Sequence, residues 1–451
     1  MADQYHFPFL GFELLQRHIT QDAFHDSLAR ADPPRCHPLT RHAVLDAITD
    51  WILNPDADHP FLWSHGPAGG GKTAIAQTIA QMFASVGRLA ASFFFSRIAV
   101  NRNDITRFIP TLAYQLALYH PEIHDDVGLA VERDPSIFSR TLMTQIQALI
   151  VKPFNAAAED PSKKTIMLER QNLVVLDGLD ECGDARSQRE VLEALAMSVK
   201  QLSIPLLFLI TSRPEHQIRL AFSKGELEPR TLVVPLDETF NPDDDIRIYL
   251  KSKFDEIKQN HPSGPQLPSD WPSDEDLLQI VRKSSGQFIY PATAVKFVES
   301  SRHHPVKRLK VLLGASEPGN DSPFTALDAL YHQLFLTIEN LDGALDLLTL
   351  LVLQDKESYY LTVNFSEEFL GLDEGEVLTM LSDLHAFVHV PKPKDLDDPI
   401  HILHDSLPDF LFDKSRSGRF FIDPRNGHAK VTAHWIEYVQ RQSQRDHGAL
   451  C

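Results

Sequence analysis

The stretch from Gly66 to Thr73, GPAGGGKT, decides the fold of this chain. It has the spacing of a phosphate-binding loop: Gly, four residues, Gly-Lys, and then Ser or Thr. An apolar run at 61–65 precedes it, and an apolar segment with few helix breakers follows at 74–86. This pattern predicts a strand, a loop and a helix. Three adjacent glycines let backbone N–H groups approach an anion at the start of a helix. We therefore predict that the loop binds a polyphosphate.

The residues of the loop have distinct predicted roles. Lys72 is expected to reach the β and γ phosphates of a nucleotide, and Thr73 is expected to offer its hydroxyl to Mg²⁺. The other predicted nucleotide contacts are Gly66, Pro67, Ala68, Gly69, Gly70, Gly71 and Ala74. An ordinary glycine-rich turn is the alternative explanation of the motif, and the flanking strand and helix patterns argue against it.

The composition is that of a globular protein with an acidic balance. The chain has 451 residues, of which 43% are hydrophobic, and this length suggests roughly two to four domains. Its 62 acidic and 43 basic residues give a formal net charge of −19. Because such a charge opposes nonspecific binding to polyanions, we predict no nucleic-acid partner.

Two further features concern the cellular compartment. The longest apolar runs, 204–210 and 347–353, are much shorter than the roughly 20 residues that a membrane helix needs, so no membrane span is predicted. The three cysteines are too few and too scattered for a disulfide framework. We therefore predict a cytoplasmic protein.

Strand and helix patterns alternate through the first half of the chain. This alternation is typical of an α/β fold with a parallel sheet and helices on both faces. Residues 155–164 are polar and are predicted to form a surface loop. The predicted strands are 61–65, 89–95, 173–176, 205–211 and 231–236.

The second half is predicted to be mostly helical. A segment with four prolines, 261–272, separates it from the sheet region. Near the end, a helix face with Val377, Leu381 and Leu384 is followed by two short strands, a pattern that indicates a winged-helix module. The predicted organisation is a lead-in at 1–59, a P-loop NTPase domain at 60–260, a small helical domain at 261–340 and a winged-helix domain at 341–451.

Three carboxylates follow the apolar strand at 173–176. Asp177 is predicted to organise the hydrated Mg²⁺, because the end of a parallel strand opens onto the phosphate site. Asp180 or Glu181 is predicted to orient or deprotonate the attacking water during hydrolysis. The alternative is a solvated acidic turn.

A cation follows the next strand. Arg213 is predicted to touch the γ-phosphate, because the ends of neighbouring parallel strands face the same crevice. The alternative places Arg213 on the surface beside a helix. The guanine-reading motif of small GTPases is not found after this strand, so the predicted nucleotides are ATP and ADP, and GTP stays open.

The order GPAGGGKT, LVVLDGLDEC and LLFLITSRP resembles NACHT-domain proteins of the STAND class of signalling NTPases, in particular their fungal NLR-like branch. The resemblance covers about residues 25–440. Further stretches that carry it are CHPLTR (36–41), SFFFSR (92–97), SGQFIYPATAVKF (285–297) and HILHDSLPDFL (401–411).

The resemblance implies roles for the motif residues. It makes 66–73 the Walker A loop, Asp177, Asp180 and Glu181 the extended Walker B site, and Arg213 sensor 1. Four residues receive weaker roles: His404 at the β-phosphate of a bound diphosphate, Pro291 at the base, and Thr40 and Arg41 on the adenine side. From the residues alone, without the resemblance, His404 would be interpreted as a structural histidine and Pro291 as a proline at a helix start.

The function that the resemblance implies is a nucleotide-dependent switch of an innate-recognition or heterokaryon-incompatibility type. ADP would hold a closed monomer, ATP would favour self-association, and slow Mg²⁺-dependent hydrolysis would reset the protein. The alternatives are a nucleotide-binding scaffold without turnover and an AAA-like motor. The effector domain and repeats usual in the family are not visible, so the chain is expected to be a truncated form, a minimal core or a partner of other chains. Its protein partners are not predicted.

Overall fold

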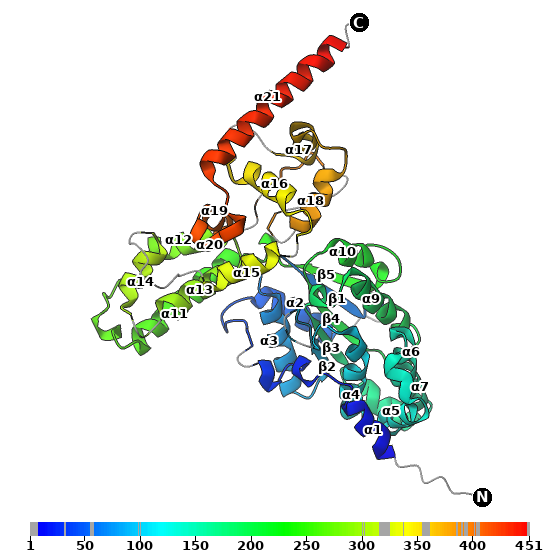
Figure 1. Ribbon diagram of the computed structural model, residues 1–451. Helices are drawn as coiled ribbons and strands as arrows, with labels where there is room; N and C mark the ends of the chain where they lie inside the picture. Colours follow the sequence, from blue (N-terminus) through cyan, green and yellow to red (C-terminus); the bar gives the residue numbers. More distant parts are fainter. Residues whose placement is uncertain are drawn as a thin grey trace, which may run out of the picture. The chain divides into compact units, whose positions relative to one another are not determined.

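The computed structural model describes residues 8–30, 33–54, 58–97, 99, 101–299, 301, 303–314, 325–336, 338–353, 361–384, 387–388, 391, 396–400, 402 and 406–448 (Figure 1). The chain divides into two compact units. The first contains residues 1–66 and 71–240, and the second contains residues 67–70 and 241–451.

The first unit is built on a five-stranded sheet with the order β2-β3-β4-β1-β5. All neighbouring strands are parallel. The strands are β1 (Phe61–His65), β2 (Leu89–Phe94), β3 (Leu173–Asp177), β4 (Leu207–Ser212) and β5 (Thr231–Pro235). Every predicted strand is present, so the predicted α/β fold with a parallel sheet is confirmed.

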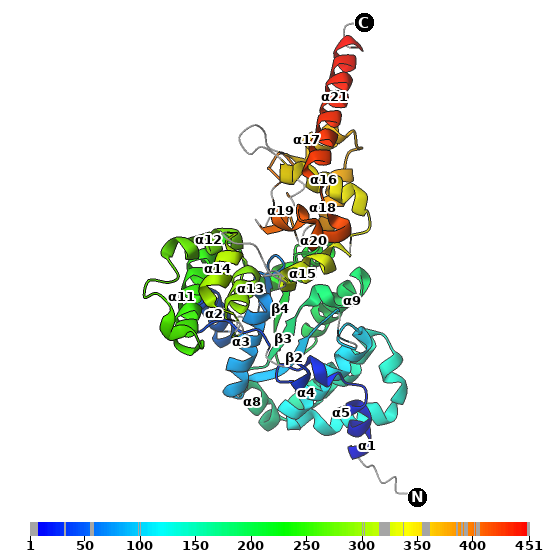
Figure 2. The same ribbon diagram turned by 60° about the vertical axis from the view of Figure 1, so that its left-hand side comes forward.

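Helices cover both faces of this sheet (Figures 1 and 2). Leu62 and Leu209 face a core formed with α2 and α3, whereas Trp63 and Ile210 face a core formed with α4 and α9. Successive strand residues point to opposite faces, so both faces bury apolar side chains. The helices of this unit are α1 (Pro8–Gln16), α2 (His42–Leu53), α3 (Lys72–Ser85), α4 (Phe108–Tyr119), α5 (Pro121–Arg133), α6 (Leu142–Ile146), α7 (Lys152–Ala158), α8 (Pro161–Glu169), α9 (Ala185–Val199) and α10 (His216–Phe222).

The predicted surface loop at 155–164 is wrong. Most of that segment belongs to α7 and α8, with a short break between them. Asp160 caps α8, because its carboxylate accepts the backbone N–H groups of Ser162 and Lys163, and Pro161 takes the first helical position. The polar composition therefore reflects capping residues and an exposed helix rather than a loop.

The segment before β1 packs within the first unit. Gly11 of α1 lies so close to α5 that a Cβ there would be 2.0 Å from the Gly128 carbonyl oxygen. The Thr20 N–H donates to Thr111 Oγ1 at 2.9 Å, and the His25 N–H donates to Ser92 Oγ at 3.0 Å. These contacts attach the lead-in to α4 and to the edge strand β2.

The second unit is helical in its described part, as predicted. A single apolar core, with Leu250, Ile280, Ala294 and Leu347 among its members, runs through it. Its helices are α11 (Pro242–Asn260), α12 (Asp274–Ser284), α13 (Ile289–Val298), α14 (Pro305–Leu312), α15 (Thr325–Phe335), α16 (Leu341–Leu353), α17 (Val363–Leu370), α18 (Glu376–Leu384), α19 (Ser406–Leu411), α20 (Lys414–Ser417) and α21 (Pro424–Gly448).

The last part of this unit does not test the winged-helix prediction. Val388 and Ile402 form one antiparallel bridge, and the predicted strands around them lie partly outside the described residues. The winged helix stays a prediction. The long helix α21 was not predicted, and its Trp435 and Tyr438 pack against Phe365 and Phe369 of α17. No helix in the described ranges is long and apolar enough to cross a membrane.

Candidate nucleotide-binding site

The strand order brings three motif-bearing strand ends together. β4 lies between β1 and β3, and the register pairs His65 with Ser212 and Asp177 with Thr211. Gly66 follows β1, and Arg213 follows β4. The carboxyl ends of these parallel strands therefore meet at one edge of the sheet, where open α/β sheets bind their ligands.

The phosphate loop leads directly into α3. Gly71 has a φ of +90° and precedes the first residue of the helix, and a Cβ on it would meet nothing within 4 Å. This open space at a helix start suits an anion that is bound by backbone N–H groups. Thr73 and Ala74 lie in the first turn of α3.

Lys72 is held beside the loop. Its Nζ donates to the Gly66 carbonyl oxygen at 2.8 Å. Burial lowers the pKa of Lys72 to about 8, and the carboxylate of Asp180 opposes this shift. A polyphosphate beside the ammonium would favour its charged form.

The middle of the loop, Pro67–Gly70, belongs to the second unit. Ala68 is buried in the core of that unit, and the Gly69 carbonyl accepts the Ile289 N–H at 3.3 Å. A Cβ on Gly69 would lie 2.4 Å from Ile289 Cγ2. Pro291, which was predicted at the base, is buried in the first turn of α13, whereas Ile289 was not predicted.

The two predicted metal ligands meet. The buried carboxylate of Asp177 accepts hydrogen bonds from the hydroxyls of Thr211 and Thr73. Burial raises the pKa of Asp177 to about 6, although the hydrogen bonds from these two hydroxyls lower it. Hard oxygen donors of this kind fit Mg²⁺, which keeps several waters and binds few protein groups besides phosphate. Among the described residues, no group of three His, Cys, Asp or Glu side chains is arranged to hold a metal ion.

Asp180 and Arg213 form a buried pair. The Asp180 carboxylate accepts the backbone N–H of Arg213 at 2.8 Å and lies 3.1 Å from its Nε. The side chain of Asp180 is 3% exposed and that of Arg213 is 13% exposed. Neither the solvated turn nor the surface arginine, the two alternatives from sequence, describes these residues.

Glu181 is bound by a residue that the sequence analysis did not assign to the site. The backbone N–H of Arg97 donates to Glu181 Oε2 at 3.0 Å, and the Arg97 guanidinium donates to the Asp180 carbonyl at 2.9 Å. Arg97 closes the SFFFSR stretch. Its place just after a predicted strand was the signal that could have identified it.

Further cations surround the carboxylates of this edge. The Arg30 guanidinium lies 3.6 Å above the Phe94 ring and donates to Gln77 at 2.7 Å. Burial lowers the pKa of Arg30 to about 10, and the charge of Asp177 opposes this shift. Arg102 donates to the Phe94 carbonyl at 2.9 Å. Burial lowers the pKa of Arg102, and the negative charges of Glu181 and Asp177 oppose this shift. Lys72, Arg102, Arg213 and Arg30 lie near the three carboxylates, and their positive charge suits an anionic ligand in an acidic chain.

The remaining predicted nucleotide contacts are less informative. Thr40 and Arg41 are buried where α2 begins, and Thr40 Oγ1 donates to the His37 carbonyl at 3.0 Å. Arg41 has a φ of +61°. His404 lies outside the described residues.

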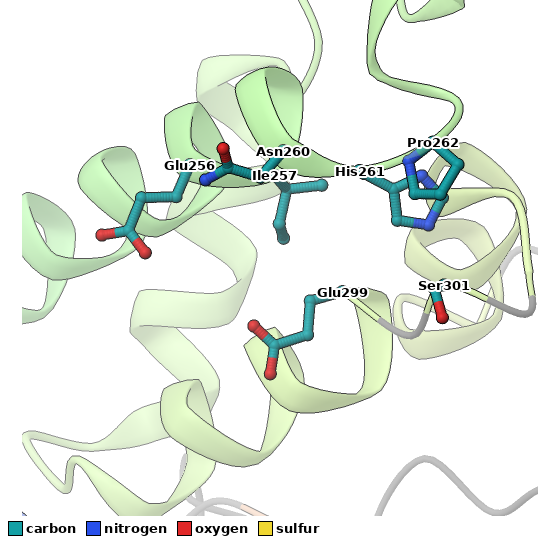
Figure 3. A pocket seen from close by; sticks show the side chains of 7 residues that line it. All are labelled: Glu256, Ile257, Asn260, His261, Pro262, Glu299 and Ser301. Carbon is teal, nitrogen blue, oxygen red and sulfur yellow. The ribbon is translucent and has the colours of Figure 1, made fainter.

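The second unit has a hollow of its own, of about 220 Å³ (Figure 3). Glu256, Ile257 and Asn260 line it from α11, and Glu299, just past the end of α13, lies on the opposite side. The Glu256 carboxylate pairs with Lys253 at 2.7 Å. This hollow has no glycine-rich loop, so it is not the phosphate site. Its lining residues are Glu256, Ile257, Asn260, His261, Pro262, Glu299 and Ser301.

Comparison with known proteins gives one family match. Residues 39–213 match the model of the family described as Nephrocystin 3, N-terminal. The matched range begins just before Thr40 and ends at Arg213, so it contains the phosphate loop and the acidic turn. No curated protein matches the sequence.

Three solved structures are similar in fold at low sequence identity. They are the Aeropyrum pernix ORC1 protein in complex with DNA, AMPPCP-bound DnaA from Aquifex aeolicus, and Drosophila ORC bound to DNA. The identities are 14%, 10% and 14%, and the TM-scores are 0.38, 0.35 and 0.33. The matches cover 86%, 92% and 91% of this chain and 96%, 98% and 92% of the other chains. These TM-scores are too low to carry an argument about function.

One prediction is corrected. The exclusion of a nucleic-acid partner does not follow from the net charge, because that charge averages over the whole chain, whereas nucleic acid is bound by a local basic face. Two of the three similar structures contain DNA, which is a property of those proteins.

The family match spans the residues that carry the phosphate loop, the acidic turn and Arg213, which follows β4. These motifs stand at one edge of a parallel sheet in which β4 separates β1 from β3. The parallel sheet with these motifs at one edge and the match over residues 39–213 fit a nucleotide-binding P-loop NTPase of the NACHT type, within the STAND class.

Proposed function

We propose that this protein is a switch whose state depends on whether ADP or ATP is bound, with slow Mg²⁺-dependent hydrolysis of ATP. The loop and Lys72 bind the phosphates, and Thr73 and Asp177 hold the metal. Mg²⁺, when bound, neutralises phosphate charge. The switch acts in the cytoplasm in a signalling pathway of the NLR type, as the resemblance to the fungal branch implies.

The observation that carries this proposal is the engagement of both candidate catalytic carboxylates. Asp180 accepts two donors from Arg213, and Glu181 accepts the Arg97 N–H. A carboxylate that already accepts strong hydrogen bonds is a poorer acceptor for the proton of an attacking water. This arrangement supports slow turnover and argues against a fast motor.

The switch also needs a part that responds to the nucleotide. We propose that residues 261–340 and 341–451 act as the small helical and winged-helix domains, and that His404 contacts the β-phosphate of ADP. Replacing His404 by Leu should then favour an open, self-associated protein. Unchanged nucleotide occupancy and unchanged size in gel filtration would refute the role of His404.

The nucleotide retained by the purified protein is the main test. We expect ADP at close to one per chain after denaturation and anion-exchange chromatography, and we expect its loss in Lys72→Ala. Turnover then separates the alternatives: a motor reaches about 1 s⁻¹ or more, and a switch is far slower. A wild type that retains no nucleotide would overturn the clamped switch, and turnover no higher than that of Lys72→Ala would indicate a scaffold.

A further inference from the structure

Arg97 links the edge strand β2 to the acidic turn at residues 178–183. β2 is the neighbour of β3 at one side of the sheet, and Phe94 pairs with Asp177. The next residues therefore leave β2 directly beside the turn that follows β3.

Three hydrogen bonds join the two segments. The Arg97 N–H donates to Glu181 Oε2, and the Arg97 guanidinium donates to the Asp180 carbonyl oxygen. Further along, the Gly183 N–H donates to the Asn103 carbonyl at 3.1 Å. The guanidinium is the only side-chain donor of the three, so substitution can remove it while the two backbone donors remain.

Asp180 is also fixed from its other side. Gln188 Nε2 donates to the same carbonyl oxygen at 3.0 Å, while Arg213 binds the carboxylate. The main chain of Asp180 is thus held by Arg97 and Gln188, and its side chain is held by Arg213. This fixes the direction in which the carboxylates of Asp180 and Glu181 point.

We propose that Arg97 is a positioning residue for ATP hydrolysis, which holds the turn so that Asp180 and Glu181 face the attacking water when ATP is bound. The inference rests on the proposed function. Arg97 acts through the acidic turn rather than by contact with the reacting atoms.

The sheet does not depend on the Arg97 side chain. The Phe95 N–H donates to the Asp177 carbonyl at 2.9 Å, and the pairing of β2 with β3 ends before Arg97. Phosphate affinity comes from the loop and Lys72. A substitution at Arg97 should therefore leave both folding and nucleotide affinity in place.

The experiment compares Arg97→Ala, Arg97→Lys and Arg97→Gln with wild type in steady-state hydrolysis of MgATP and in binding of ADP. Arg97→Ala should lower kcat about tenfold, because a small misplacement of catalytic groups is costly. Its affinity for ADP should stay within about twofold of wild type, as expected when only transition-state interactions are lost. The Lys and Gln variants should recover part of kcat, because each keeps an N–H donor.

Arg186→Ala is the matched control. The Arg186 side chain is 81% exposed and pairs with Glu190 on its own helix α9. This variant should match wild type in both assays.

Each other outcome has a defined meaning. Equal kcat in wild type and Arg97→Ala would overturn the role of Arg97 and leave the switch proposal standing. Parallel losses of kcat and of ADP affinity would also overturn it, because they indicate a structural role. Wild-type turnover no higher than that of Lys72→Ala would refute hydrolysis itself, and with it this role.

Discussion

The carboxylate of Asp180 binds both the backbone N–H and the guanidinium of Arg213, at 2.8 and 3.1 Å. The two residues are 33 positions apart in sequence. Asp180 lies in the turn after β3, and Arg213 follows β4, so the pair ties two adjacent strand ends together. The anion and the cation therefore hold each other in place at the edge where the phosphate loop begins.

The Asp180–Arg213 pair should contribute to stability as a unit. Arg213→Ala leaves a buried carboxylate without its cation, which should cost about 3 kcal/mol in the free energy of unfolding. Arg213→Ala combined with Asp180→Asn should cost less than the sum of the single variants, with a coupling of about 1–3 kcal/mol. Urea denaturation of the three variants measures this, with the exposed pair Arg186 and Glu190 as control. Additive losses would show that the pair does not act as a unit.

Thr73 and Asp177 should be needed for Mg²⁺ to strengthen ATP binding. In wild type, Mg²⁺ should strengthen ATP binding, because both residues offer hard oxygen ligands next to the phosphates. Thr73→Val and Asp177→Asn should each weaken that effect on the order of tenfold or more, the scale found when metal-site groups are removed. Titration calorimetry measures the affinity for ATP in the presence of Mg²⁺ and in the presence of EDTA. The exposed Thr165, replaced by Val, is the control, and variants with a full Mg²⁺ effect would contradict the assignment.

Two loop glycines should respond differently to alanine. Both have positive φ, so alanine costs about 1–2 kcal/mol of backbone strain at either position. Gly69→Ala also places a Cβ 2.4 Å from Ile289 Cγ2, whereas Gly71→Ala faces open space. Urea denaturation without nucleotide should therefore rank Gly69→Ala as the less stable variant. Ile289→Ala, combined with Gly69→Ala, should reduce the difference in stability between the two glycine variants. Equal stability of Gly69→Ala and Gly71→Ala would contradict the contact with Ile289.

His120 should make stability depend on acidic pH. It is buried, its Nε2 lies 2.8 Å from Asn172 Oδ1, and burial lowers its pKa to about 4. The unfolded chain takes up this proton near pH 6.5, before the folded chain does, so stability falls as the pH drops from 6.5 to 4.

The test of this linkage is His120→Gln, which keeps an amide donor for Asn172. The loss of stability between pH 7 and pH 4.5 should be smaller in this variant than in wild type, by up to about 3 kcal/mol. Burial also lowers the pKa of His65 to about 4, but His65 is present in both proteins and therefore does not contribute to the difference between them. An identical pH dependence in both proteins would show that His120 takes up its proton over the same pH range in the folded and the unfolded chain, which would contradict the lowered pKa.

The strands were predictable because local sequence is sufficient to specify them. Each contains a short apolar run, because a sheet that is covered on both faces buries side chains on both sides of a strand. The predicted run 61–65 has the same limits as β1. The segment at 155–164 was not predictable in this way, because Asp160 and Pro161 suit a loop and a helix start equally well until the helix itself is seen.

The candidate site was predictable only where a motif carries it. Gly66 to Thr73, Asp177 and Asp180 stand at fixed spacings from apolar runs, so their residue types indicate their chemistry. Arg97 and Arg30 have no such spacing. Their roles depend on hydrogen bonds to residues more than 40 positions away, Asp180 and Gln77, and such contacts exist only after the chain has folded.

The sequence by itself determined that this protein has a phosphate-binding loop, a parallel sheet and an acidic strand end, because each is specified by neighbouring residues. The tertiary structure decided how the charges are paired. The strand order places β4 between β1 and β3, which brings Arg213 to Asp180, and the edge position of β2 brings Arg97 to the acidic turn. Strand order follows from the packing of the whole sheet, and a buried charge takes whichever partner the folded chain brings within reach.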